Sequence, residues 1–453
     1  MAPRIPPSFH VLLSLAFALL GQIPAFADNP LVPDFGMADP HMHIFNNKAY
    51  LYTTRDADRN AKKFVMPDWH IWSSDDLINW KHELTILPTE TYMGKSTQCW
   101  APDVAAMKGK YYFYFSNGYD DTGVMVGDHP NGPFKDALGK PMLPKGLTST
   151  WEYDATVLVD SGVPYMSFGR RQNQWKTEKE SGQPIKYHIV KLKNDMISLA
   201  EKPRPIEING DFAPTDKPDL HVHNGRYYLA AGANYAVAST IYGPYTARRS
   251  VVDDTDIYGL NQRAHGNFCA WNNQCFFVWC HFITQGAKFR ESYMTYVHYR
   301  ANGDMDYDRG FLDAHFKDGV GQYSATWKTI EAEWYMAAEH VEKMEKKDGG
   351  FEVAGIKNGA WIIFPHVSDV PQNAVLAFTV SAQKGGSIEV HEDRVDGPLM
   401  GVCVVPGTGG WSSYQDVSCT LSNSPGKKNL CLVFKGSVPD LLHLDSFRFT
   451  AVK

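Results

Sequence analysis

Five segments of this 453-residue chain repeat one layout. Each has an ionisable residue, a short strand-like run, a turn built on Asn, Gly or Asp-Ser-Gly, and a second run rich in aromatic and β-branched residues. Two such runs around a short turn predict a β-hairpin. The segments are "ADPHMHIFNNKAYLYTT" from Ala38, "APDVAAMKGKYYFYFS" from Ala101, "YDATVLVDSGVPYMSFG" from Tyr153, "TDKPDLHVHNGRYYLAAG" from Thr215 and "AHGNFCAWNNQCFFVWCH" from Ala264.

The spacing of the hairpins indicates the architecture. They recur at intervals of roughly 50 to 65 residues, enough for a four-stranded sheet, and repeated sheets of this kind close radially into a β-propeller. Five copies therefore predict an all-β fold with five blades. In each copy an ionisable residue lies eleven positions before an aromatic one, and the first strand of each blade lines the central axis. Five side chains are thus expected to converge on one funnel: Asp39, Asp103, Asp154, Asp216 and His265.

Carboxyl groups around an axial pocket suit the hydrolysis of glycosidic bonds. One carboxyl group protonates the leaving oxygen while another activates water or attacks, and a third raises the pKa of the acid. We find no Gly-rich phosphate loop, GxSxG elbow, HExxH helix or CxxC pair at zinc spacing. The pair His41 and His43 would suit a metal ion, but a polar or packed strand edge is the preferred interpretation.

Composition limits the partners. The net charge is −6, with 44 basic and 50 acidic residues dispersed along the chain, so no basic stripe is available for nucleic acid. Aromatic residues make up 13% of the chain, which suits a β-rich fold and also suits sugar rings that stack on flat side chains.

The first residues are typical of an export signal. Arg4 precedes the apolar run "VLLSLAFALL", and "AFA" from Ala25 gives a cleavage pattern of small residues. We predict a signal peptide at 1–27 and a mature chain from Asp28 that is exported to the periplasm or the extracellular space. No later apolar stretch is long enough to span a membrane.

Seven cysteines remain in a compartment that permits disulfides, so at least one is free or pairs with another chain. Cys269 and Cys275 flank an expected hairpin turn. A cross-strand bridge and two free thiols both stay open for this pair.

The order and spacing of the motifs resemble glycoside hydrolase family 43 over about residues 30 to 320. The matching segments are "ADP" at Ala38, "WAPDV" at Trp100, "YDATVLVDSG" at Tyr153, "DKPDLHVHNGRYYL" at Asp216 and "HG" at His265. This resemblance implies a five-bladed propeller, which we place at residues 28–322, and an inverting mechanism.

The resemblance also implies roles for particular residues. Asp39 would be the general base, and Asp154 would modulate the pKa of the acid and orient it. Trp100 and Arg290 would contact the sugar. His265 corresponds to a family histidine that contacts an axial metal ion, often calcium, directly or through water.

The general acid departs from the family pattern. The family has Glu in an E-x-P segment, whereas this chain has Asp216 in "DKP", one methylene shorter. The eleven-residue spacing favours Asp216, and Asp219 and His221 are the local alternatives. A catalytically silent, lectin-like sugar-binding protein is the alternative function.

After about residue 320 the sequence changes to short alternating strands with polar turns, which predict a β-sandwich. With "GTGGW" and the closing "LDSF", residues 327–453 resemble carbohydrate-binding module family 6, a jelly-roll module. The resemblance implies a structural calcium ion and an aromatic pair that clamps a sugar ring, although a core role is the alternative for Trp361. His443 stands where the family has a ligand-contacting Asn. The implied residues are Glu331, Glu333 and Asp445 for calcium, and Trp361 and Trp411 for the sugar.

Together these features predict an exported glycoside hydrolase that acts on plant or algal polysaccharides or oligosaccharides. The sequence does not choose among an arabinofuranosidase, a xylosidase and a galactosidase, nor between exo and endo attack. It leaves the oligomeric state open, with a monomer favoured.

Overall fold

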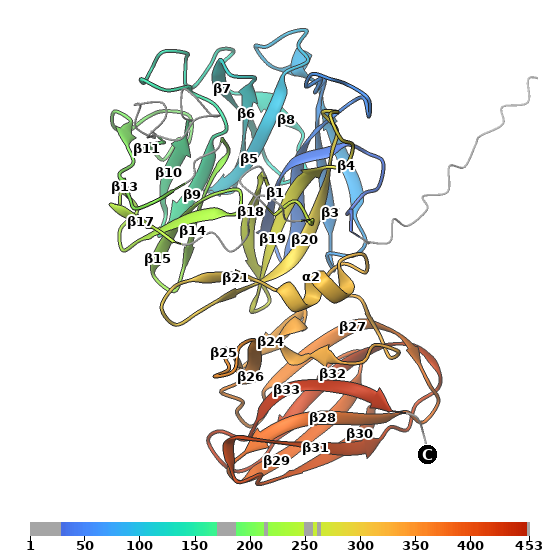
Figure 1. Cartoon of the computed structure of the whole chain (residues 1–453). Coiled ribbons are helices and arrows are strands. Elements are labelled where there is room, and N and C mark those ends of the chain that lie inside the picture. Colours follow the sequence, from blue (N-terminus) through green and yellow to red (C-terminus); the bar gives the residue numbers. More distant parts are fainter. Residues whose placement is uncertain (1–28, 170–186, 213–215, 249–256, 261–263, 451–453) are drawn as a thin grey trace, which may run out of the picture.

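The computed structural model describes residues 29–169, 187–212, 216–248, 257–260 and 264–450. The predicted signal peptide at 1–27 lies outside the described residues. Figure 1 shows two bodies, with the first part of the chain above and the last part below. Strands dominate both, as an all-β fold requires. In the described ranges, no helix is long and apolar enough to cross a membrane.

The upper body contains five sheets, each built from strands that are consecutive in the chain. The five predicted hairpins are all present as β1–β2, β5–β6, β9–β10, β14–β15 and β18–β19. The strands of the first three sheets are β1 (Met37–Phe45), β2 (Lys48–Arg55), β3 (Trp69–Ser74) and β4 (Lys81–Ile86); β5 (Cys99–Met107), β6 (Lys110–Asn117), β7 (Asp121–Gly127) and β8 (Phe134–Asp136); and β9 (Thr156–Asp160), β10 (Val163–Phe168), β11 (His188–Lys191) and β12 (Arg204–Pro205). Those of the last two are β13 (Ile208–Asn209), β14 (Pro218–His223), β15 (Arg226–Ala231), β16 (Asn234–Ala238) and β17 (Tyr245–Ala247); and β18 (Gly266–Trp271), β19 (Gln274–Phe282), β20 (Arg290–Tyr299) and β21 (Met305–Tyr307).

The first strand of each hairpin lies beside the next one. Strand β1 contacts β5, β5 contacts β9, β9 contacts β14, β14 contacts β18, and β18 contacts β1 again. We call these five strands the inner strands. They surround a cavity of about 350 Å³ that all five of them line. Asparagines form two of the tight hairpin turns. Asn46 and Asn47 take the left-handed backbone that such turns require, and Asn272 and Asn273 do the same.

Asp103 is displaced from the position that its spacing predicts. Tyr50 is the third residue of β2 and pairs with His43, whereas Tyr114 is the fifth residue of β6 and pairs with Asp103 itself. Counting eleven residues back from Tyr114 therefore ends two residues further along the inner strand than the same count does at Asp39. The prediction that Asp103 joins the other four side chains was wrong.

Two further sheets form the lower body, and they pack face to face through ring contacts such as Phe364 on Phe447, with centroids 4.8 Å apart. Strand β22 pairs with β27, so strands of this body begin at residue 323. One sheet contains β22 (Tyr323–Ser324), β27 (Trp361–Val370), β32 (Gly426–Lys435), β29 (Gly385–Glu392) and β30 (Leu399–Pro406), with β24 (Ala337–Glu339) on β27. The other contains β25 (Glu342–Glu345), β26 (Phe351–Ala354), β33 (His443–Thr450), β28 (Val375–Ala382) and β31 (Gly410–Thr420), with β23 (Ile330–Glu331) on β33.

The two bodies share one buried apolar cluster. It runs from Met42 and Met294 of the upper body through Phe311 to Ile362 and Phe447 of the lower body. Helix α2 (Arg309–His315) lies at this junction, followed by the short turns of η2 (Ala332–Trp334); η1 (Pro88–Glu90) lies in the first body.

All seven cysteines carry free thiols. Cys269 pairs with Phe276 and Cys275 with Ala270 across the β18–β19 hairpin. The two thiols therefore lie on opposite faces, and they pack against different apolar clusters. This register does not suit a bridge between Cys269 and Cys275.

Candidate active site

Four of the predicted side chains line one cavity at the starting ends of the inner strands: Asp39, Asp154, Asp216 and His265. Asp39 lies in β1, and the other three lie one or two residues before β9, β14 and β18. Asp39 and Asp154 both have a left-handed backbone, with φ of 46° and 53°. Strained backbone of this kind concentrates at functional sites.

His265 links two of the carboxyl groups. Its Nδ1 lies 2.7 Å from Oδ1 of Asp39, and its Nε2 lies 3.0 Å from Oδ1 of Asp216. Burial disfavours a charged ring, but Asp216 and Asp39 outweigh burial and raise the pKa of His265 to about 10. The ring is therefore an imidazolium at neutral pH and donates one hydrogen bond to each carboxylate.

Arg290 holds Asp39 from the other side. Its Nη1 donates to Oδ1 of Asp39 at 2.8 Å, while Nε and Nη2 donate to the buried carboxylate of Asp56 at 2.9 and 3.0 Å. Burial alone would raise the pKa of Asp39, but Arg290 and His265 lower it to about 2. Asp39 is thus ionised at every ordinary pH. Its Oδ2 makes no bond to a residue in the described ranges, so this oxygen is left for water.

Asp154 holds a proton near neutral pH. Burial first, and then the charge of Asp216, raise its pKa to about 7. Ligand atoms of Asp154, Asp216 and His265 all lie within 4.8 Å of one another. Two carboxyl groups this close titrate as a pair, so the proton belongs to Asp154 and Asp216 together. The hydroxyl of Tyr153 donates to Oδ2 of Asp216 at 3.3 Å.

Aromatic rings form the wall of the cavity. Trp100 lies beside Tyr119 with centroids 4.3 Å apart, and Phe64 lies under the guanidinium of Arg290 at 4.9 Å. The sequence analysis singled out Trp100 and Arg290 but missed Asp56, Tyr119 and Phe64. These three lie outside the strand starts that the repeats mark, and no spacing identifies them.

Lys217 is a further residue that the sequence analysis missed. It directly follows Asp216, has a φ of 58° and is 1% exposed. Its Nζ donates to Nδ1 of His41 at 2.7 Å and to the carbonyl of Pro102 at 3.3 Å. This ammonium group therefore lies on the axis between the candidate active site and the 350 Å³ cavity.

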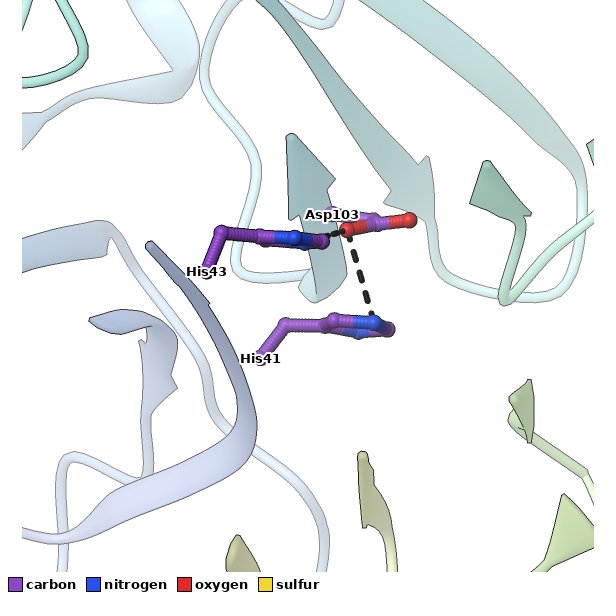
Figure 2. A group of neighbouring side chains, drawn as sticks. All are labelled: His41, His43 and Asp103. Atoms are coloured by element: carbon purple, nitrogen blue, oxygen red, sulfur yellow. Dashed lines mark hydrogen bonds and ion pairs between the residues drawn. The ribbon is translucent and has the colours of Figure 1, made fainter. Parts of the chain in front are cut away.

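The histidine pair lies in that second cavity. Figure 2 shows the rings of His41 and His43 side by side, with Asp103 beside both. Nε2 of His43 lies 2.7 Å from Oδ1 of Asp103, and Nε2 of His41 lies 3.4 Å from the same oxygen. Because Lys217 donates to Nδ1 of His41, the proton of this ring is on Nε2, where it faces Asp103. That proton suits a hydrogen-bonded network better than a metal ligand.

The alternative acids lie in the same network. Asp219 is buried and accepts from Nδ1 of His221 at 3.0 Å, and Nε2 of His41 lies 3.6 Å from its other oxygen. Both Asp219 and His221 line the second cavity rather than the one that holds Asp39. Geometry therefore favours Asp216 over either alternative.

An axial metal ion does not fit His265 as a direct ligand in this arrangement. Both ring nitrogens already donate to carboxylates. The nitrogen that binds a cation would first have to lose its proton and its carboxylate partner.

The predicted calcium residues of the lower body do lie together. Burial and the charge of Asp445 raise the pKa of Glu331 to about 7. Burial, Asp308 and Glu331 raise that of Glu333 far above its usual range. Oε2 of Glu333 is buried without a hydrogen-bond partner among the described residues. Lys346 donates to Asp445 at 2.5 Å and offsets part of this charge. Crowded carboxylates with an unpartnered buried oxygen suit a hard cation such as calcium, but the ligand atoms of Glu331, Glu333 and Asp445 do not all lie within 4.8 Å of one another.

The two predicted sugar-clamping tryptophans come from different sheets. Trp361 lies in β27, where it pairs with Glu339 of β24 and Val433 of β32, and it donates from Nε1 to Glu339 at 2.9 Å. Trp411 lies in β31 and stacks on His443, with centroids 4.5 Å apart. Both side chains are partly exposed.

Comparisons with known proteins agree with this division of the chain. Residues 27–305 match the family model of Glycosyl hydrolases family 43, and residues 331–451 match that of Carbohydrate binding module (family 6). The chain is 27% identical over 490 residues to an arabinoxylan arabinofuranohydrolase of Paenibacillus polymyxa, which covers 95% of this chain and 75% of the relative. It is 32% identical over 261 residues to a xylosidase/arabinosidase of Bacteroides ovatus, which covers 48% of this chain and 78% of the relative.

A solved structure shares the fold. An arabinoxylan arabinofuranohydrolase of Bacillus subtilis, in complex with cellotetraose, matches with a TM-score of 0.55 and 24% identity over 94% of this chain and 97% of that chain. The first family model spans more than half of the chain and includes every residue of the cavity around Asp39. The protein therefore belongs to glycosyl hydrolases family 43, is a glycoside hydrolase, and carries a carbohydrate binding module of family 6 after its catalytic region.

Proposed function

We propose that this protein hydrolyses arabinofuranosyl or xylosyl linkages of xylan-type polysaccharides with inversion at the anomeric carbon. The observation that carries this proposal is the pair of carboxylates on the two sides of His265. Asp39 is bound at one ring nitrogen and Asp216 at the other.

The separation of these groups supports inversion. An imidazole that binds one oxygen at each nitrogen holds the two oxygens roughly 7 Å apart, given ordinary hydrogen-bond lengths. Inverting glycosidases keep their two carboxyl groups about 6.5–9.5 Å apart, because a water molecule must fit between the base and the sugar. Retaining enzymes need about 5 Å, which this bridge does not allow.

The charges support the assignment of roles. Asp39, ionised and with Oδ2 free of protein bonds, is the general base that takes a proton from the attacking water. Asp216 is the general acid, and it shares the proton that the raised pKa of Asp154 retains near pH 7. Trp100 offers a flat face to a sugar ring. Arg290 is a positioning residue, since its donors hold Asp39 and Asp56.

The overall architecture that we propose is a five-bladed propeller followed by a jelly-roll module. The five consecutive sheets and the ring of contacts from β1 back to β1 support the blade count. The two facing sheets of the lower body support the module. The names of the relatives, an arabinoxylan arabinofuranohydrolase and a xylosidase/arabinosidase, support the choice of substrate.

Two further expectations belong to this proposal. The signal-like sequence at 1–27 supports export to the space outside the cytoplasm, where an enzyme meets polymeric substrates. Calcium bound by Glu331, Glu333 and Asp445 would neutralise carboxylates that otherwise repel one another.

The test is a substrate screen with purified protein. Arabinoxylan and aryl α-arabinofuranoside, β-xyloside and galactoside substrates are offered, and the anomer first released is read by proton NMR. We expect arabinose or xylose release with inverted configuration, and none from Asp39→Asn that still binds xylan. Release with retained configuration, or turnover of the galactoside alone, would overturn the proposal.

A further inference from the structure

Two thiols of the lower body lie where the edges of its two sheets approach each other. Cys403 belongs to β30, the last strand of one sheet, and Cys419 belongs to β31, the last strand of the other. Cys403 is 1% exposed and Cys419 is partly exposed. Both pack against the apolar core between the sheets.

The backbone brings these two residues opposite each other. Strands β30 and β31 are joined by a short connection at residues 407–409, and they run back along each other from it. The carbonyl of Met400 accepts a hydrogen bond from the amide of Ser422 at 2.7 Å. The two strands belong to different sheets but contact each other and run in opposite directions, so three residues forward from Met400 and three back from Ser422 bring Cys403 to the level of Cys419.

A second observation gives the same placement. A methyl group at Gly401 would lie 3.6 Å from Sγ of Cys419. Gly401 and Cys403 are two residues apart in β30, so their side-chain positions share a face of that strand. The sulfur of Cys419 is therefore directed at the face of β30 that carries Cys403.

The two thiols also affect each other's ionisation. A hydrogen bond with Cys419, together with burial, raises the pKa of Cys403. The same bond lowers the pKa of Cys419. Cys419 is thus the better nucleophile of the two and the more accessible one.

We propose that Cys403 and Cys419 form a disulfide bond that fastens together the edge strands of the two sheets. The oxidant is another disulfide, carried by a thiol–disulfide oxidoreductase or by a small molecule such as oxidised glutathione. The Cys419 thiolate attacks one oxidant sulfur and displaces the other as a thiolate. The Cys403 thiolate then attacks Cys419 Sγ in the mixed disulfide and displaces the second thiolate. The two protons lost by the cysteines go to the two thiols of the reduced oxidant.

The bond has a structural consequence at an exposed edge. Strand β30 exposes Leu399, Val402 and Val404, and an unpaired apolar edge of this kind invites pairing with another chain. A disulfide across β30 and β31 limits how far the edges separate and restricts the unfolded chain between residues 403 and 419. The proposal goes beyond the hydrolytic function and depends on export only for the supply of oxidant.

The test is peptide mapping of the full chain after incubation with oxidised glutathione or with dithiothreitol, without reduction before digestion. We expect a linked peptide pair that contains Cys403 and Cys419 in the oxidised sample, two fewer alkylatable thiols than the seven of the sequence, and a higher melting temperature than in the reduced sample. Separate alkylation of both cysteines in the denatured, oxidised sample would overturn the proposal.

Variants separate this bond from general effects of oxidation. Cys419→Ser, at the partly exposed position, should lose the linked peptide and the difference in melting temperature between oxidised and reduced protein. Cys431→Ala, in β32 of the same sheet as β30, should keep both. Arabinoxylan hydrolysis, measured in parallel, reports on the proposed activity separately, because neither cysteine is near Asp39. A linked pair other than Cys403 with Cys419 would also contradict the assignment.

Discussion

At the scale of single residues, the chemistry depends on which group holds the proton beside Asp216. His265 donates to Asp216 and keeps negative charge there, while Asp154 retains a proton up to about pH 7. In the mechanism that we propose, the leaving group receives its proton from this shared pair rather than from one isolated acid. The side chain of Asp216 is one methylene shorter than the Glu of the family. Hydrogen bonds from His265 and Tyr153 fix its position.

The first prediction concerns the general acid. Asp216→Ala should slow hydrolysis of arabinoxylan by about a hundredfold to ten-thousandfold, the usual contribution of general acid catalysis. It should affect aryl glycosides with activated leaving groups much less, because such groups depart without protonation. Steady-state kcat/KM on both substrates measures the difference. Asp219→Asn, in the second cavity, is the matched control and should affect both alike. Equal losses from Asp216→Ala on the two substrates would show a binding role instead.

The second prediction uses the raised pKa of Asp154. The folded protein holds this proton between about pH 4, the ordinary carboxyl pKa, and about pH 7, whereas the unfolded chain has lost it. The contribution of Asp154 to stability is therefore complete below pH 4 and is lost as the pH rises through 7. The side chain of Asp154→Asn stays neutral at every pH. The difference in melting temperature, variant minus wild type, should therefore increase from about pH 4 to about pH 7 and stay constant above pH 7.

The measurement is thermal unfolding of both proteins from pH 4 to pH 9, together with activity. Asp348→Asn, on an exposed turn, is the control and should follow the wild type at every pH. Activity of Asp154→Asn should fall even where its stability rises, because the shared proton is lost. A constant difference in melting temperature across the pH range would contradict the assigned proton.

At the scale of elements, the hairpins were predictable because their signal is local. Turn residues such as Asn46 and Asn272, and aromatic residues on the following strands, set each hairpin within about twenty residues of chain. The alignment of one hairpin with another is not local. Tyr114 and Tyr50 occupy different positions in equivalent strands, so a fixed spacing placed Asp103 two residues away from the site.

The contacts of a site residue come partly from other sheets, and the spacing of residues in the sequence does not predict them. Asp56 follows β2 in an ordinary polar segment, and only the approach of Arg290 from β20 makes it part of the site. Lys217 similarly reads as a solvated lysine, although its ammonium group is buried against His41 of another sheet.

The third prediction concerns the proposed calcium residues in β23, η2 and β33. Calcium should raise the melting temperature of the full chain. At a hundredfold excess over its dissociation constant, it should add about 2.7 kcal/mol to the free energy of unfolding. Glu333→Gln should abolish this response. Without calcium the same variant should be more stable than the wild type near neutral pH, because burial raises the pKa of Glu333 and the wild type must take up a proton to fold, whereas the amide is neutral in both states.

Differential scanning calorimetry with calcium and with chelator measures both effects. Glu342→Gln, exposed on β25, should keep the full calcium response. A wild type that melts identically with calcium and with chelator would remove the calcium assignment, and the crowded carboxylates would then need another partner.

At the scale of the whole molecule, the two bodies are joined by buried polar contacts as well as by the shared apolar cluster. Nε2 of Gln274, in β19, donates to the carbonyls of Glu333 and Tyr335 at 2.8 and 2.7 Å. Lys343, in β25, donates to Oε1 of Gln274 at 2.6 Å and to the carbonyl of Val297 at 3.1 Å. The sequence suggested separable units, because Gln274 and Lys343 look like surface residues until the bodies meet.

The last prediction follows from this junction. Because buried contacts continue from one body to the other, the full chain should unfold in a single calorimetric transition. Gln274→Ala leaves two carbonyls without this donor and removes one acceptor of Lys343, and each buried polar group left unpaired costs about 1–3 kcal/mol. The variant should therefore melt at a lower temperature, and its transition should broaden or divide as the bodies unfold separately. Gln415→Ala, on the exposed face of β31, removes the same side chain without touching the junction and should melt as the wild type does. Two well-separated transitions in the wild type would mean that the junction does not couple the bodies, and hydrolysis of soluble substrate would then be insensitive to Gln274→Ala.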